Sequence, residues 1–249
     1  MPDDEPRWGK SISHFLPLAA LPEEESDRHY REVHTPFARR LLRGAEQVVS
    51  YHTARVTAEL DLAGGWRQRP RAFRFIVMRF LPGRSLEFPE VVHERIVQDH
   101  RNCLRELRSF PVREQVLLDR LSGQTSLVKY VLELDRRADT SQQAADEHLG
   151  EQLAGLVEQM DSAFGLRQVL VDHVEGEGAT EAVDEPGQRP LGRLLPQTRR
   201  HAYVEVYADH PDWAQEWFAQ PAVADVLRDP WWDTVRCYRV AEECGLDRR

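Results

Sequence analysis

The order of the predicted secondary structure constrains this chain more than any single motif. In the first half, short segments rich in β-branched and aromatic residues alternate with longer amphipathic ones, which predicts a strand, a helix, two strands, a helix and a strand. The strands are expected at residues 11–18, 47–56, 71–81 and 112–118, and the helices at residues 23–42 and 89–107. The second half predicts the same order, which indicates two copies of one module.

In the second half, strands are expected at residues 127–134, 168–174, 201–207 and 235–240, and helices at residues 141–160 and 211–228, the last interrupted by a proline. This βαββαβ order is that of a ferredoxin-like unit, whose helices cover one face of a four-stranded sheet and leave the other bare. Two bare faces can close on each other within one chain.

We therefore predict an α+β fold of two tandem ferredoxin-like units that form an intramolecular, pseudo-dimeric α+β barrel. An N-terminal tail of residues 1–10 would precede a first unit at residues 11–122 and a second at residues 126–245. Alternate strand residues would line the lumen, which is the expected ligand pocket.

The predicted helix at residues 23–42 carries a histidine on its apolar side. His34 shares that side with Tyr30, Val33, Phe37, Ala38 and Leu41. Two interpretations stay open: His34 is a base at an active site, or it is a hydrogen-bonded histidine between helix and sheet. His148 falls at the equivalent position of the second half, and we expect it to be structural.

The strand at residues 47–56 offers a second histidine. His52 alternates with Tyr51, so one of the two must face the lumen. His52 and His34 are the candidate catalytic bases, since an ordinary histidine pKa near 6.5 leaves a base available at neutral pH. The candidate substrate-binding residues are Tyr51, Trp66, Arg74, Tyr203 and Glu205. Trp66 belongs to the connection at residues 57–70, which we expect to act as a lid.

The string RHYREVHTPFARRLLRGAEQVVSYHTARV at residues 28–56 resembles the EthD-like branch of the dimeric α+β barrel superfamily. That branch typically has a histidine shortly before a proline in its first helix, followed by a strand that begins near a tyrosine; here these are His34, Pro36 and Tyr51. The string WFAQPAVADVLRDPWWDTV at residues 217–235 resembles the broken second helix of related barrels.

The resemblance implies a function more specific than the residues alone do. A tandem, arginine-rich example looks most like the actinomycete oxygenases that tailor aromatic polyketides in antibiotic biosynthesis. It implies base-assisted reaction of O₂ with a polycyclic anthrone- or quinol-type intermediate and no bound cofactor, with a diffusible reduced flavin as the alternative. A cyclase, dehydratase or isomerase that uses the same histidine, and a heme or small-molecule binding protein, stay open as alternatives.

Composition and missing motifs exclude several other classes. The formal charge of −9 disfavours nucleic acid as a partner, and three cysteines without CxxC spacing favour a reduced, cytoplasmic protein. No segment has the pattern of a signal peptide or a membrane span. The sequence lacks HExxH, a phosphate loop and GxSxG, so we expect no metal site, nucleotide or serine nucleophile. A small aromatic substrate and O₂ are the expected partners, and a homodimer is compatible with the sequence.

Overall fold

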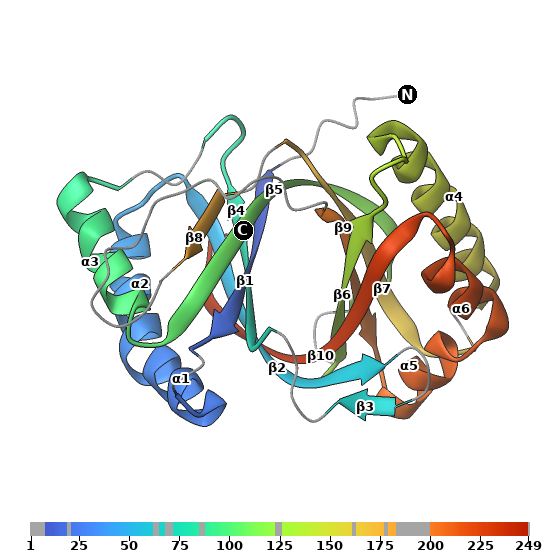
Figure 1. The fold of residues 1–249 in the computed structure, drawn as a ribbon, viewed down its shortest axis with the longest axis horizontal. Helices are drawn as coiled ribbons and strands as arrows, with labels where there is room; N and C mark the ends of the chain where they lie inside the picture. The colour runs from blue at the N-terminus through green and yellow to red at the C-terminus, as the bar shows by residue number, and fades with distance from the viewer. Residues whose placement is uncertain are drawn as a thin grey trace.

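The computed structural model describes residues 8–18, 21–61, 65–67, 72–84, 88–122, 126–160, 163–176, 179–182 and 200–248. Eight strands form a closed antiparallel barrel (Figure 1). Their order around it is β1 (Gly9–Pro17), β4 (Arg74–Phe80), β2 (Val48–Asp61), β10 (Trp232–Asp247), β6 (Val128–Arg136), β9 (Arg200–Ala208), β7 (Leu166–Val174) and β5 (Leu104–Asp119), and β5 pairs back onto β1. The short strands β3 (Gly65–Arg67) and β8 (Ala179–Ala182) extend β2 and β5 respectively.

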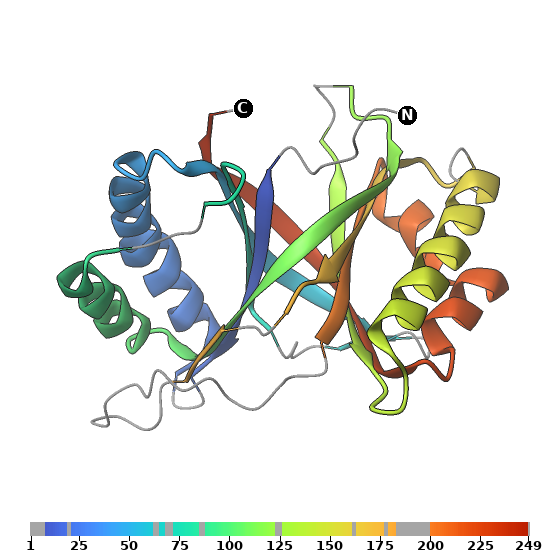
Figure 2. The ribbon, with the colours of Figure 1, turned by 90° about the horizontal axis from the view of Figure 1, so that it is seen from above.

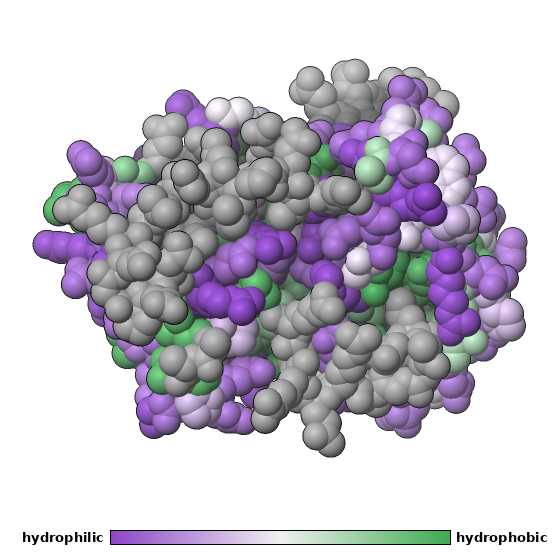
Figure 3. Space-filling model, in the orientation of Figure 1, coloured by the Kyte–Doolittle hydropathy of each residue, from purple (hydrophilic) through white to green (hydrophobic). Residues whose placement is uncertain are grey.

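The helices lie outside the barrel, at its two opposite sides (Figures 1 and 2). One side carries α1 (Glu23–His29), a π-helical turn (Tyr30–His34), α2 (Thr35–Arg43) and α3 (Glu90–His100). The other carries α4 (Gln142–Met160), α5 (Pro211–Phe218) and α6 (Pro221–Arg228). Within the described residues no helix combines the length and the apolar character that crossing a membrane requires. Hydrophilic side chains occupy much of the described surface in Figure 3.

Two prolines shape the helical segments as the sequence suggested. The predicted helix at residues 23–42 is one continuous helical run, and its π-helical turn ends just before Thr35 and Pro36. Proline has no N–H for the helical ladder and crowds the carbonyl four residues back, which favours a local change of winding. Pro221 separates α5 from α6, as predicted.

The lengths of α3, β5 and β10 were predicted wrongly. The helix expected to reach residue 107 ends at His100, and β5 begins at Leu104 instead of residue 112. Its first half pairs with β1 and its second half with β7. In the same way β10 runs over 16 residues because it pairs first with β6 and then with β2. Strands that bridge two partners are longer than their local pattern indicates.

Similar pairs of residues face each other at two places in the barrel interior. In β1 and β5, Lys10 is paired with Val112 and Ile12 with Phe110. In β6 and β10, Lys129 is paired with Val240, and Val131 with Tyr238. The middle of the interior is a packed apolar cluster that contains Ile12, Phe75, Phe110, Val131, Tyr238 and Val240. The lumen is therefore filled at its middle, contrary to the expected apolar pocket there.

Both lysines of the chain lie in the interior, and they hold one of the candidate site residues. Glu205, expected to bind substrate, lies 2.6 Å from Lys10 Nζ and also contacts Lys129. Lys10 further contacts Glu114 at 2.6 Å and Asp172 at 2.8 Å. Such a network holds the strands in register, and the carboxylate of Glu205 is occupied by ammonium groups.

Asp172 differs from the other carboxyl groups of this network in the direction of its pKa shift. Burial, together with the nearby Glu205, raises its pKa to about 8, although Lys10 opposes the shift. Between its ordinary pKa of 3.8 and this value, the native state holds a proton that the unfolded state has lost, so stability falls as pH rises. We expect Asp172→Asn to raise the free energy of unfolding by about 1–3 kcal/mol at pH 7 and to match the wild type near pH 4.

Urea unfolding at both pH values measures this difference. Glu114→Gln is the matched control, because Lys10 and Arg79 lower the pKa of Glu114 in spite of its burial. Its substitution should destabilise the protein at pH 7. A loss of stability in both variants would contradict the assigned protonation of Asp172.

Candidate functional site

An apolar cavity of about 180 Å³ lies between α2, α3 and the outer face of the sheet. The polar side chains at its wall are those of His34, Tyr51 and His100, with the hydroxyls of Ser13 and Ser109. The rest of the wall is apolar: Phe15, Phe37, Ala38, Leu41, Leu42, Ile76, Met78, Phe88, Ile96 and Leu107. The structure thus brings two of the predicted site residues, His34 and Tyr51, to one cavity.

His34 is oriented by a carboxylate from the other helix. Its Nδ1 lies 2.7 Å from Asp99 Oδ2, and His29 Nε2 lies 2.9 Å from the second oxygen of Asp99. These hydrogen bonds hold the pKa of Asp99 below its ordinary range, although burial opposes them. An ionised Asp99 accepts the Nδ1 proton of His34, which leaves Nε2 as the basic nitrogen.

The apolar surroundings of His34 keep it neutral. The side chain is 6% exposed, and burial lowers its pKa below 6.5 although the hydrogen bond to Asp99 opposes the shift. The rings of Tyr30 and His100 lie on it, with centroids at 4.6 and 4.8 Å. A neutral histidine whose tautomer is fixed by a carboxylate can take a proton from a bound molecule at neutral pH.

Tyr51 offers a hydroxyl at the same cavity. Its Oη lies 3.0 Å from Tyr30 Oη, and burial raises the pKa of Tyr51 to about 12, so it stays protonated. Gly245 permits this packing, since a Cβ at that position would lie 2.8 Å from Tyr51 Cε1. Tyr51 can therefore donate a hydrogen bond to a bound oxygen only if Tyr30 is the donor between the two hydroxyls.

Arg74 is buried against the ring of Tyr30, the hydrogen-bond partner of Tyr51. It is 1% exposed, donates to Asp27 at 2.5 Å and to Thr53 at 3.1 Å, and its guanidinium lies 4.5 Å from the centre of the Tyr30 ring. It is not among the residues at the cavity wall. Arg74 lies against Tyr30 and not at the cavity, and its expected contact with substrate stays a prediction.

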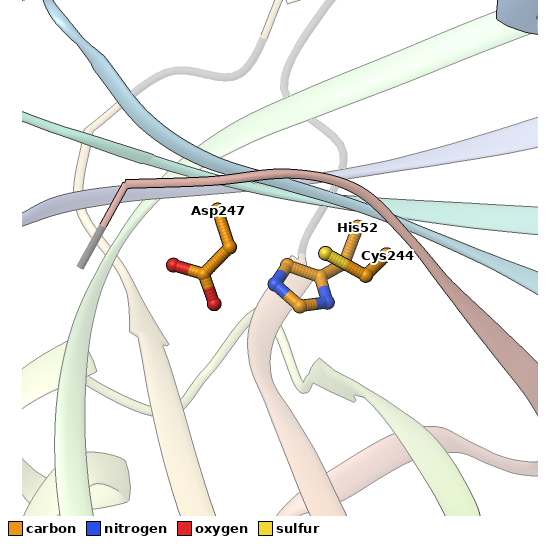
Figure 4. A group of neighbouring side chains, drawn as sticks. All are labelled: His52, Cys244 and Asp247. Carbon is orange, nitrogen blue, oxygen red and sulfur yellow. The ribbon is translucent and has the colours of Figure 1, made fainter.

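His52 lies on the opposite face of the same strand. Ala54 and Val56, which share its face, belong to the interior cluster, whereas Tyr51 packs against the helices. His52 is paired with Cys244 of β10, and the side chains of His52, Cys244 and Asp247 gather there, with possible ligand atoms within 4.8 Å of one another (Figure 4). His52 Nδ1 also lies 4.0 Å from Glu242. The two candidate bases are therefore separated by the barrel wall.

The remaining predicted site residues lie elsewhere. Tyr203 faces the interior and its Oη lies 3.2 Å from His14 Nδ1. Trp66 lies in β3, opposite Leu60 of β2, and its side chain is outside the described part of the structure. Tyr203 and Glu205 are not at the cavity of His34, so among the described side chains the single lumenal site predicted from the sequence is divided.

Asp99 was missed in the sequence, although the repeat carried a signal for it. In the second half His148 Nε2 lies 3.1 Å from Asp229, which directly follows α6, whereas Asp99 lies in the last turn of α3. The two acids close the similar strings IVQD and VLRD. His148, however, is stacked on Trp231 with ring centroids 4.6 Å apart, and Trp217 and Phe218 fill the layer beside the sheet. The described second half thus repeats the pair of histidine and aspartate, but aromatic side chains pack around it.

Two further groups of side chains have the composition of metal ligands. Glu114, Asp172 and Glu205 converge, but Lys10 occupies the space between them. Asp146 also lies near two buried histidines, at 2.6 Å from His173 Nδ1 and 3.1 Å from His201 Nε2. A hydrogen bond between His173 and Asp146, with His201 close by, accounts for this second group.

Comparison with known proteins gives similarity in fold alone. No family model matches the chain. No curated protein matches it in sequence either. An anthrone oxidase-like protein of known structure has 13% sequence identity and a TM-score of 0.55, with 98% of this chain and 96% of that one covered. A candidate monooxygenase from Fusobacterium nucleatum has 9% identity and a TM-score of 0.49, with 95% and 93% covered.

A chlorite dismutase from Candidatus Nitrospira defluvii has 10% identity and a TM-score of 0.49, with 95% of this chain and 92% of that one covered. At such low sequence identity, these comparisons show similarity of fold only. Over nearly its whole length, this chain shares the fold of the anthrone oxidase-like protein, an α+β barrel with helices packed outside it.

Proposed function

We propose that this protein is an oxygenase of electron-rich phenolic compounds of the quinol or anthrone type. The observation that carries the proposal is a neutral His34, fixed by Asp99, at the wall of an apolar cavity that Tyr51 also lines. The similarity in fold to an anthrone oxidase-like protein supports the same reaction class.

His34 takes a proton from the substrate, and Tyr51 binds the oxyanion that results. His34 Nε2 takes the acidic proton of the substrate, and the resulting anion transfers an electron to O₂ and then forms a carbon–oxygen bond with it. The peroxide anion takes this proton back from His34 on its outer oxygen. The O–O bond then breaks as His34 removes the hydrogen left on the same carbon, and hydroxide leaves with that proton as water. One oxygen atom thus enters the product as a carbonyl, and the other leaves as water. Tyr51 stabilises the substrate oxyanion by a hydrogen bond, and the apolar wall excludes competing water.

The cavity size limits the substrate. Drug-sized ligands occupy pockets of about 300–1,000 Å³, whereas a cavity of about 150 Å³ holds benzene. At about 180 Å³, the cavity fits a substrate of one or two rings, and a polycyclic polyketide would need α2 and α3 to separate. We therefore favour a small phenol over the polycyclic substrate suggested by the resemblance.

Oxygen consumption tests the proposal. We expect the purified protein to convert 1-naphthol, and more slowly anthrone, to the quinone with one O₂ consumed per product formed, above the rate without protein. Turnover under ¹⁸O₂ should place one labelled atom in the quinone. Product formation under nitrogen at the aerobic rate would remove the oxygenase assignment.

Loss of the Tyr51 hydroxyl should slow the chemical step. We expect Tyr51→Phe to lower kcat by about 10²-fold with a small change in KM, since the lost hydrogen bond acts on charge that develops during reaction. Tyr130→Phe is the matched control, because it removes another buried hydroxyl, bonded to the Pro211 carbonyl in the second half. Equal losses in the two variants would indicate a general packing effect.

The pH dependence should report His34. Because burial lowers its pKa, kcat/KM should rise with pH through a value below 6.5 and then stay level. In Asp99→Asn the hydrogen bond that raises this pKa is weakened, so the acid limb should move to lower pH while the plateau falls. An acid limb that stays in place in this variant would show that another group is the base.

The same dyad could serve a reaction without oxygen. A cyclase, dehydratase or isomerase also begins by proton removal at His34, and product formation without O₂ uptake would select that function. A heme-binding protein would show a Soret band after addition of hemin. The 180 Å³ cavity does not fit a macrocycle, and the equivalent layer of the second half is filled by Trp217, Phe218 and Trp232.

We also propose that the halves are tandem ferredoxin-like units of the EthD-like type, at residues 11–122 and 126–245. Each half places its first strand between its fourth and its third, in the orders β5-β1-β4-β2 and β10-β6-β9-β7. The repeated pairs of histidine and aspartate, His34 with Asp99 and His148 with Asp229, support this assignment.

A further inference from the structure

A second cavity, of about 380 Å³, lies at one end of the barrel interior and is rich in arginine. Arg105, Arg108, Arg200 and Arg236 lie at its wall together with His14 and Glu133. It is distinct from the cavity of His34. His14 and Arg108 point into the interior, whereas their neighbours Ser13 and Ser109 line the apolar cavity behind the same two strands.

The repeat places two of the arginines at equivalent positions. Arg108 of β5 is paired with His14 of β1, and Arg236 of β10 is paired with Glu133 of β6. His14 Nδ1 lies 3.2 Å from Glu133 Oε1, so the two pairs meet across the interior. Two guanidinium groups therefore approach one cavity from the two halves of the barrel.

Carboxylates neutralise most of this charge but leave an excess. Arg200 and Arg236 share Glu133, each at 3.4 Å, and also contact Asp135, at 3.2 and 3.7 Å. Glu106 binds Arg108. Among the described side chains, four arginines thus face three carboxylates, and burial lowers the pKa of His14 to about 4, which keeps it neutral.

Several donors of the cluster also lack acceptors. Arg200 is buried, with its side chain 2% exposed, and its Nη1 has no hydrogen-bond partner among the described residues. The buried hydroxyl of Tyr238, at the same cavity, likewise has none there. Buried donors without acceptors are costly, and a bound acceptor removes that cost.

We propose that this cavity binds a small molecule through a carboxylate or phosphate group. The planar forks of Arg108 and Arg236 suit two oxygens of such a group, and the exposed Arg105 lies at the wall to attract it. The molecule is a second ligand of the protein, bound apart from the phenol, and its binding does not depend on the proposed oxygenase activity.

Calorimetric titration at low ionic strength tests this site, with inorganic phosphate and malonate as separate probes. We expect one site per chain for at least one probe, a Kd at least tenfold weaker in Arg236→Ala, and a several-fold weaker Kd in Arg105→Ala, whose exposed side chain can be removed without disturbing the fold. Glu133→Gln should tighten binding, because it removes a competing negative charge. The probe that binds more tightly identifies the group.

Arg113→Ala is the matched control, since Arg113 belongs to the same strand as Arg108 but is half-exposed and lies 3.6 Å from Glu175. It should leave Kd unchanged. Absence of binding by both probes at millimolar concentration would overturn the proposal, and so would an equal effect of Arg113→Ala and Arg105→Ala, which would indicate attraction by net charge alone.

Discussion

Replacing His34 by alanine should abolish most of the oxygen consumption with 1-naphthol. A positioned general base contributes about 10²–10⁴-fold to rate, so we expect kcat/KM to fall within that range while the protein stays folded. The loss should be partly restored by added imidazole, because the substitution leaves space beside Asp99. Oxygen-electrode rates and far-ultraviolet circular dichroism together measure this result.

Two other histidines provide the controls. His93 is exposed on α3, close to Asp99 in sequence, and His93→Ala should leave the rate unchanged. His52→Ala separates the two candidate bases, and we expect less than about a threefold effect since His52 faces the interior. If His52→Ala lost most of the rate while His34→Ala stayed active, His52 in the barrel interior would be the base.

Replacing Lys10 by methionine should have the largest effect on stability. Lys10 is the common partner of Glu114, Asp172 and Glu205, and its side chain is 2% exposed. Removal of one partner from a buried ion pair leaves uncompensated charge and costs about 3–5 kcal/mol. We expect a decrease of that size in the free energy of unfolding by urea at pH 7.

The exposed Glu243 of β10 supplies the control for Lys10→Met. Glu243→Gln should change the free energy of unfolding by less than about 0.5 kcal/mol. Lys129→Met, at the equivalent position of the repeat, should behave like Lys10→Met. If Lys10→Met cost less than about 1 kcal/mol, the interior network would not hold the barrel together.

The features predicted well from the sequence are those that depend on local pattern. The helix at residues 23–42 has a continuous apolar stripe, and the repeated element order indicated a barrel without reference to distant contacts. His34 and Tyr51 were singled out for the same reason, since both belong to the motif at residues 28–56. The structure places both at one cavity, and their roles stay a prediction.

The features predicted wrongly depend on partners far along the chain. The extent of β5 and β10 follows from the two neighbours that each strand joins, which no window of ten residues contains. The direction of His52, which the sequence left open, depends on which face of β2 the helices cover. Asp99 becomes a partner of His34 only when α3 packs beside α2, 65 residues away.

The filled interior of the barrel differs most from the prediction. Alternation along each strand identified residues that share a face, but it did not show that Phe75, Phe110 and Tyr238 meet at the centre. Ion pairs such as that between Lys10 and Glu205 join residues from opposite halves, 195 positions apart. Packing of that kind is set by closure of the barrel.

The most direct test of the proposed active site is a crystal structure with 1-naphthol bound under anaerobic conditions. We predict that the rings occupy the cavity between α2, α3 and the sheet, with the phenolic oxygen within hydrogen-bond distance of His34 Nε2. A ligand beside His52 in the barrel interior, with the cavity of His34 unchanged, would contradict the account.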